Sequence, residues 1–194
     1  MKSTDPEFWD SRYRAGEMPW DFHGVPRALF TYLQTMATPG RALIPGCGSG
    51  YEVRAFHERD WDVLAIDYSS AAIDRARRVL GSLAEKVVLA DFFAHDFGEQ
   101  KFDVIYERTF LCSQPPDRWP AYAQRVVELL RPGGKLIGFF LYGNEDEPPP
   151  YPLTEEGARQ LFSRNFARVT DESVLDSLPV FAGRERWQIW QLQK

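Results

Sequence analysis

The residues best suited to bind a ligand are a glycine-rich turn, GCGSG at positions 46–50, and an acid, Asp67, seventeen residues after its last glycine. A short apolar stretch precedes the turn, and Asp67 ends a second one. Glycines after a first strand let the backbone approach a ligand, and the helix that follows offers free amide groups at its N-terminus. A carboxylate at the end of the second strand can accept both hydroxyls of a ribose. The pattern therefore predicts half of a mononucleotide-binding βαβ unit.

Tyr51 indicates which nucleotide the turn fits. The dinucleotide fingerprint GxGxxG has a third glycine that permits close packing over a pyrophosphate, and Tyr51 stands where that glycine should be. The turn is therefore predicted to bind a ligand that has a ribose but no pyrophosphate. S-adenosylmethionine (SAM), with its adenine, ribose and amino-acid tail, fits this description. An NAD-linked oxidoreductase is the least favoured alternative.

Polar residues also follow the third and fourth apolar stretches. Asp91 can accept from the amine of an adenine and Phe92 can pack on its ring, although a helix cap beside a core phenylalanine is an alternative. Glu107 and Arg108 are adjacent at the end of the fourth stretch, and neither is expected to be buried without a partner. We interpret them as ligand-binding residues, with a mutual or surface ion pair as the alternative.

Alternating strands and helices predict an α/β fold. Continuous apolar strands separated by helices are typical of a parallel sheet covered on both faces, and the last two strands are expected to form an antiparallel hairpin. The expected strands lie at 42–45, 61–67, 86–90, 102–106, 135–142, 167–175 and 184–193. The expected helices lie at 5–13, 26–36, 50–59, 69–83, 118–130 and 154–162. The prediction is a Rossmann-like, mostly parallel seven-stranded sheet in a single domain over 1–194.

The composition is that of an ordinary globular protein. The 194 residues carry a net charge of −5 without a basic block, which disfavours nucleic acid as a partner. The longest apolar run, 136–142, is far shorter than a membrane span. The first ten residues lack the apolar segment of a secretory signal, so we expect a cytoplasmic protein with no membrane partner. We expect a monomer that acts on a small molecule, with a dimer left open.

The cysteines and histidines do not suggest nucleophilic or metal chemistry. Cys47 lies in the glycine turn without a partner base, and Cys112 lies in an apolar run, so both are expected to be small buried residues. His23, His57 and His95 lack the spacing of metal ligands, and no metal is predicted.

Several separate motifs resemble one known family. They are FWDSRYRAGEMPWD at 8–21, LIPGCGSGYEV at 43–53, YERTFLC at 106–112 and PPPYPLTEEGARQLF at 148–162. Together with AIDYS at 65–69 and LLRPGG at 129–134, they resemble the class I SAM-dependent methyltransferases and, more narrowly, the thiopurine S-methyltransferase family, which includes the plant halide and thiol methyltransferases. The resemblance implies the class I methyltransferase fold, with residues 1–36 as an N-terminal lid.

The resemblance also implies roles for single residues. Aromatic rings of the lid would cover the cofactor, and the glycine turn would line its methionine moiety. Asp67 would bind its ribose, and Asp91 and Phe92 would bind its adenine. Glu107 would contact its amino group. Arg108 matches an arginine near the substrate in the thiopurine branch, whereas the plant branch tends to have tyrosine there. The implied cofactor-binding set is Trp9, Tyr13, Trp20, Pro45, Gly46, Cys47, Gly48, Asp67, Tyr68, Asp91, Phe92 and Glu107.

Methyl transfer from SAM needs alignment more than a protein nucleophile. A cationic donor and an anionic acceptor lose charge as they react, so a water-poor site favours the reaction. The faces of Trp9 or Trp20 can hold the sulfonium by cation–π attraction, worth roughly 0.5–2 kcal/mol. Arg108 can favour a thiolate acceptor by stabilising its charge. We therefore predict a SAM-dependent methyltransferase acting on a thiol, a thiopurine-like compound or a halide- or thiocyanate-like anion. The alternatives are an O- or N-methyltransferase of a small metabolite and a non-catalytic SAM-binding regulatory protein.

Overall fold

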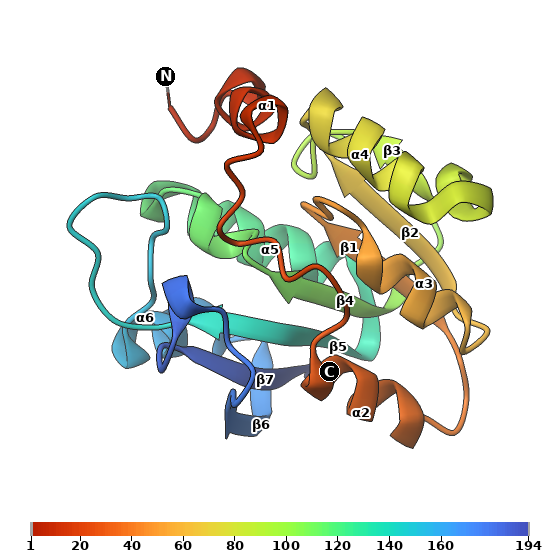
Figure 1. The fold of residues 1–194 in the computed structure, drawn as a ribbon. Coiled ribbons are helices and arrows are strands. Elements are labelled where there is room, and N and C mark those ends of the chain that lie inside the picture. The colour runs from red at the N-terminus through yellow and green to blue at the C-terminus, as the bar shows by residue number, and fades with distance from the viewer. Residues whose placement is uncertain (1, 194) are drawn as a thin grey trace. The chain divides into compact units, whose positions relative to one another are not determined.

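The computed structural model describes residues 2–193 (Figure 1). The chain divides into two compact units, Met1–Asp96 and Phe97–Lys194. Each unit contains part of the sheet together with its own helices. The organisation as one domain with a lid at 1–36 stays a prediction.

The first unit contains three parallel strands in the order β3-β2-β1. Two helices, α1 and α2, precede these strands in the chain, and α3 and α4 pack on β2. The elements are α1 (Pro6–Ala15), α2 (Arg27–Thr35), β1 (Arg41–Pro45), α3 (Tyr51–His57), β2 (Asp62–Asp67), α4 (Ser70–Leu80) and β3 (Val87–Leu89).

Helix α4 illustrates how the sequence fixes local structure in this unit. The Ser69 hydroxyl accepts a hydrogen bond of 3.1 Å from the amide of Ala72, which caps the first turn. Ala72, Ile73 and Leu80 lie on the buried face. Gly81 has φ +60° and ends the α-helix, three residues before the predicted end, and a 3-10 helix continues from Gly81 to Lys86.

The second unit contains four strands in the order β4-β5-β7-β6. The pair β4–β5 is parallel, whereas β5–β7 and β7–β6 are antiparallel. The elements are β4 (Phe102–Arg108), α5 (Trp119–Leu129), β5 (Leu130–Leu141), α6 (Glu155–Phe162), β6 (Phe166–Ser173) and β7 (Glu185–Leu192), with 3-10 helices at Leu111–Ser113, Pro116–Arg118 and Pro179–Phe181. An aromatic cluster joins α6 to the strands, because the Phe162 ring lies 5.9 Å from Phe140 and 5.0 Å from Trp190.

Strand β5 differs from its prediction at one end. The sequence predicted a strand from residue 135, after the turn at 132–134, but β5 begins at Leu130. Leu130 already pairs with Phe102 of β4, and the register then shifts before Val104 pairs with Lys135. The Pro-Gly-Gly segment is thus an irregular part of the strand, because pairing with β4 holds both of its ends.

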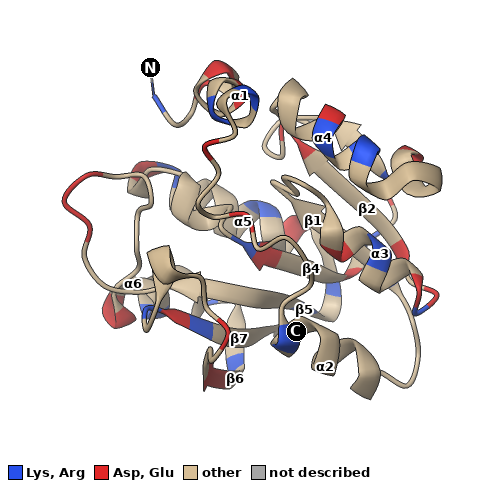
Figure 2. Cartoon of the chain, in the orientation of Figure 1, with Lys and Arg blue, Asp and Glu red and all other residues tan. Residues whose placement is uncertain are grey.

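These pairings confirm the predicted fold class, a mostly parallel seven-stranded sheet with an antiparallel C-terminal hairpin. Acidic and basic residues are interspersed along α1 and α4, whereas α2 carries a single charged residue, Arg27 (Figure 2). Within residues 2–193, no helix is long and apolar enough to cross a membrane.

Candidate functional site

The glycine turn and Asp67 are in direct contact in the first unit. The turn runs from β1 into α3, and its three glycines have φ of +59°, +52° and +73°, a region that favours glycine. The Asp67 carboxylate accepts a 3.0 Å hydrogen bond from the amide of Gly48 and a 2.9 Å bond from the amide of Ser69. Asp67 therefore holds the turn against the end of β2.

Asp67 keeps the capacity to bind a ligand. Burial raises its pKa to about 6, which outweighs the lowering by hydrogen bonds from the amides of Ser69, Gly48 and Tyr68. The carboxylate is thus mostly ionised at neutral pH. A carboxylate offers about four lone-pair positions, and the three amides leave room for a ribose hydroxyl. The predicted ribose contact is compatible with this geometry.

Aromatic residues from the N-terminal segment gather at the same turn. The Tyr13 hydroxyl lies 2.7 Å from the place where a Cβ on Gly48 would stand. The Trp20 ring packs edge-on against Tyr13, with centroids 6.1 Å apart, and against Trp9, with centroids 5.3 Å apart. Three rings predicted for the lid therefore form one cluster, and Tyr13 brings it onto the glycine turn.

Buried polar contacts that sequence reasoning missed attach the N-terminal segment to this unit. The Ser49 hydroxyl donates to Asp21 at 2.6 Å, and Arg75 of α4 donates to Ser49 at 2.7 Å and to Asp21 at 3.3 Å. Asp21 is 9% exposed, so its carboxylate depends on these partners. Asp21 is the last residue of the motif MPWD. Its position directly after Trp20 in the sequence was the one sign that it belongs to the same site.

A second acid, Asp10, caps helix α4 from α1. Its carboxylate accepts hydrogen bonds from the Ser69 hydroxyl at 2.5 Å, the Ser70 hydroxyl at 3.0 Å and the Ala71 amide at 3.0 Å. The backbone oxygen of Ser3 accepts from both Trp9 and Tyr68, each at 2.7 Å. The backbone at Ser3 therefore links two predicted site residues, Trp9 and Tyr68.

The predicted adenine residues lie after β3. Asp91 is exposed, and its carboxylate accepts a 2.8 Å hydrogen bond from the amide of Phe93. Phe92 is 2% exposed, so its ring packs mainly among other protein atoms. The half-buried Phe93, with its ring 5.4 Å from that of Phe92, is the more accessible aromatic at this place.

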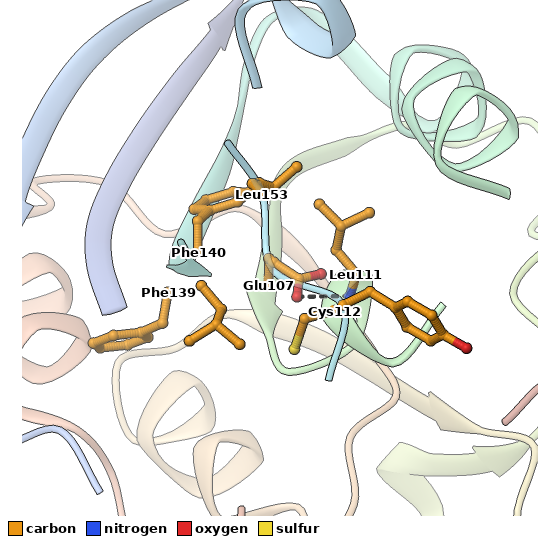
Figure 3. A pocket seen from close by; sticks show the side chains of 8 residues that line it. Glu107, Leu111, Cys112, Phe139, Phe140 and Leu153 are labelled. Carbon is orange, nitrogen blue, oxygen red and sulfur yellow. Dashed lines mark hydrogen bonds between the residues drawn. The ribbon is translucent and has the colours of Figure 1, made fainter. Parts of the chain in front are cut away.

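In the second unit, Glu107 is buried at the end of β4. Its carboxylate accepts from the amides of Phe110 at 3.0 Å and Leu111 at 2.9 Å, and from the Tyr122 hydroxyl at 3.0 Å. Figure 3 shows it beside Leu111 and Cys112, at a cavity of about 10 Å³, which is room for one water molecule. These partners, and not Arg108, compensate for the burial of Glu107. The alternative interpretation, an ion pair between Glu107 and Arg108, is therefore disfavoured.

Glu107 supports a pH prediction. Burial raises its pKa from 4.5 to about 7, so ionisation destabilises the folded chain as pH rises through this window. Glu107→Gln removes the charge, and its free energy of unfolding relative to wild type is expected to rise between pH 4.5 and pH 8 by at most about 3 kcal/mol. Urea denaturation at both pH values measures this change. The exposed Glu99→Gln serves as control, and a pH-independent difference for Glu107→Gln would contradict the assignment.

Arg108 lies on the opposite face of β4, because neighbouring residues of a strand alternate. It is half-buried, and its guanidinium carbon lies 5.6 Å from the centroid of the Phe139 ring. Thr109 follows with φ +61°, which is unfavourable for a β-branched residue. Such strain at the end of a strand is typical of functional positions.

Both cysteines are buried, as predicted. Burial raises the pKa of Cys47 and of Cys112 well above the usual range of a thiol, and nearby acids raise both further. Neither is suited to form a thiolate. Among residues 2–193, no group of three or more His, Cys, Asp or Glu side chains is arranged to hold a metal ion.

A wider opening lies in the second unit at the carboxyl end of β5. It measures about 610 Å³, a size that suits a small molecule. Its two arginines are already paired, Arg184 with Glu145 at 3.3 Å and Arg186 with Asp171 at 2.6 Å. The groove therefore does not present a concentrated positive charge.

Comparison with known proteins gives this geometry its context. The family model of thiopurine S-methyltransferase matches residues 4–193. The chain is 37% identical over 161 residues to Probable thiol methyltransferase 2 of Arabidopsis thaliana, covering 79% of this chain and 70% of that protein. It is 29% identical to Thiocyanate methyltransferase 1 of Brassica oleracea, covering 94% of this chain and 84% of that protein.

Solved structures agree on the fold. The 1,6-didemethyltoxoflavin-N1-methyltransferase of Burkholderia thailandensis, with bound S-adenosylhomocysteine, superposes with a TM-score of 0.77 at 22% identity, covering 97% of this chain and 87% of that one. The sheet, the glycine turn and the match to methyltransferases define a SAM-dependent methyltransferase. The chain belongs to the thiopurine S-methyltransferase family.

Proposed function

We propose that this chain transfers the methyl group of SAM to the sulfur of a small thiol. The observation that carries the proposal is the glycine turn held by the buried Asp67, in a chain whose relatives are named thiol, thiocyanate and thiopurine methyltransferases. Bound SAM would supply an electrophilic methyl group, and the protein would need to bind it, align the acceptor and exclude water. We further propose that the chain acts as a cytoplasmic monomer.

On the donor side, the turn at Gly46, Cys47 and Gly48, preceded by Pro45, is proposed to hold the methionine moiety. Asp67 and Tyr68 are proposed to hold the ribose. The positive φ values of the glycines and the free acceptor capacity of Asp67 support these roles.

Asp91 and Phe92 are proposed to hold the adenine. The exposure of Asp91 favours its role, whereas the burial of Phe92 leaves little of its ring for a ligand to contact. Glu107 is proposed to bind the ammonium of the donor, which would also favour its ionised form.

The N-terminal segment, residues 1–36, is proposed to act as a lid over the donor. The ring cluster of Trp9, Tyr13 and Trp20 supports this role. Because Tyr13 lies on Gly48, it is expected to shift when the methionine moiety binds there. The contact of Ser49 with Asp21 would keep the segment close to the turn during that shift.

Arg108 is proposed to orient the acceptor, and Arg108→Ala tests this role. Turnover with a thiol is expected to fall about 100-fold, while the Kd for S-adenosylhomocysteine changes less than threefold, because the residue would act on the acceptor and not on the donor. Steady-state kinetics and calorimetry measure the two quantities. Equal losses in both would instead place Arg108 at the donor.

The acceptor class is tested by a product screen with a labelled methyl donor. Thiols, halides, phenols and amines are supplied in parallel to the wild-type chain. Label in a thioether supports the proposal, whereas label only in a methyl halide would instead favour an anionic acceptor. Label only in an ether or a methylated amine would instead favour an O- or N-methyltransferase, and donor binding without any product would favour a regulatory protein.

A further inference from the structure

A second charged residue shares the face of the sheet on which Arg108 lies. Arg108 of β4 pairs with Phe139 of β5, which pairs with Trp187 of β7. Residues two apart on a strand share a face, so Glu185 lies on this face as well. The ring centroids of Phe139 and Trp187 are 5.1 Å apart, and these two apolar side chains share the face with Arg108 and Glu185.

Glu185 is a buried carboxylate in an electrostatic interaction with Arg108. It is 6% exposed, and the Ser177 hydroxyl donates a hydrogen bond to it. Burial raises its pKa, the Ser177 bond and the positive charge of Arg108 lower it, and the charge of Asp176 raises it. The charge of Glu185 in turn helps to raise the pKa of Cys112. The carboxyl is thus buried, within reach of a cation, and able to take up a proton.

The position of Glu185 favours a functional role over a structural one. Leu141, the last residue of β5, pairs with Glu185, so the start of β7 lies at the edge where β5 ends, which is the edge where ligands bind in such sheets. Burying a carboxylate costs free energy unless its partners compensate, and an apolar residue of similar volume avoids that cost. A purely structural residue at this position therefore has no need of a charge.

We propose that Glu185 determines the charge of the acceptor and takes the proton of a neutral thiol, an inference that rests on the proposed function. As the acceptor sulfur bonds to the methyl carbon, the thiol proton passes to the Glu185 carboxylate and later to water. The bond between methyl carbon and donor sulfur breaks, and its electron pair stays on the donor sulfur. An anion such as thiocyanate has no proton to lose and gains nothing from this carboxylate.

The electrostatic interaction of Glu185 with Arg108 sets the preference for a neutral or an anionic acceptor. With both residues ionised, their charges offset each other, so the site attracts anions weakly and accepts a neutral thiol. Neutralising Glu185 leaves the guanidinium charge of Arg108 to attract an anion. Glu185→Gln should therefore lose thiol methylation and gain anion binding, two changes of opposite direction in one variant.

The test compares kcat/KM for a neutral alkyl thiol and for thiocyanate in wild type, Glu185→Gln and the exposed control Glu172→Gln. Glu185→Gln is expected to lose about 100-fold with the thiol, as for removal of a general base, and to gain severalfold with thiocyanate. The wild-type thiol activity should fall as pH drops and Glu185 takes up a proton, and Glu185→Gln should lack this limb. Equal changes with both acceptors, or an unchanged pH profile, would overturn the inference.

Binding provides a readout that does not need turnover. Thiocyanate is titrated calorimetrically into the complex with S-adenosylhomocysteine, and Glu185→Gln should bind it severalfold more tightly than wild type, whereas Glu185→Asp, which keeps the charge, should not. Unchanged thiocyanate affinity in Glu185→Gln would contradict the inference. A wild-type chain that methylates neither acceptor would overturn the proposed function, whereas this titration still tests whether Glu185 sets the charge of the acceptor.

Discussion

Gly138→Ala is expected to lower the free energy of unfolding by at least about 3 kcal/mol, the range of strongly disruptive substitutions. Gly138 has φ +151°, and an added Cβ would lie 1.8 Å from the backbone oxygen of Glu107. No real contact is that short, so β4 and β5 would have to separate where they hold Glu107 and Arg108. Urea denaturation followed by circular dichroism measures the loss.

Gly24→Ala is the matched control for this substitution. A Cβ on Gly24 would meet no atom within 4 Å, so its stability is expected to stay within about 0.5 kcal/mol of wild type. A Gly138→Ala protein as stable as Gly24→Ala would contradict the close approach of β4 and β5.

Asp67→Ala is expected to weaken binding of S-adenosylhomocysteine by at least about 100-fold. The change removes the proposed acceptor of the ribose hydroxyls and also releases the amides of Gly48 and Ser69, and each hydrogen bond to a charged group is worth about 1.5–3 kcal/mol. Calorimetric titration gives the affinity.

Asp62→Ala, at the exposed start of the same strand, provides the control. Its surface pair with Arg41 contributes little, so affinity should match wild type. Asp67→Asn keeps one acceptor oxygen and should fall between the two. An unchanged affinity in Asp67→Ala would remove Asp67 from the donor site.

Local pattern was enough to predict the glycine turn, the place of Asp67 and the strands, apart from the start of β5. Each of these depends on residues close in sequence: apolar runs fix the strands, and three glycines fix the turn. The fold class followed because alternating strands and helices permit few arrangements.

Contacts between distant residues were not predictable from the sequence. Asp21 meets Arg75 and Asp10 meets Ser69 across more than fifty positions, and neither acid differs in local pattern from a surface residue. The burial of Phe92 and the shared face of Arg108 and Glu185 depend likewise on packing and on strand register.

The central claim is that the glycine turn and Asp67 hold the methyl donor. Hydrogen exchange followed by mass spectrometry, with and without S-adenosylhomocysteine, tests it most directly, because exchange reports protection of individual backbone segments. We predict that the ligand slows exchange at residues 46–50 and 67–69, with further protection across Trp9–Trp20. Protection confined to other segments, with none at the turn, would contradict the account.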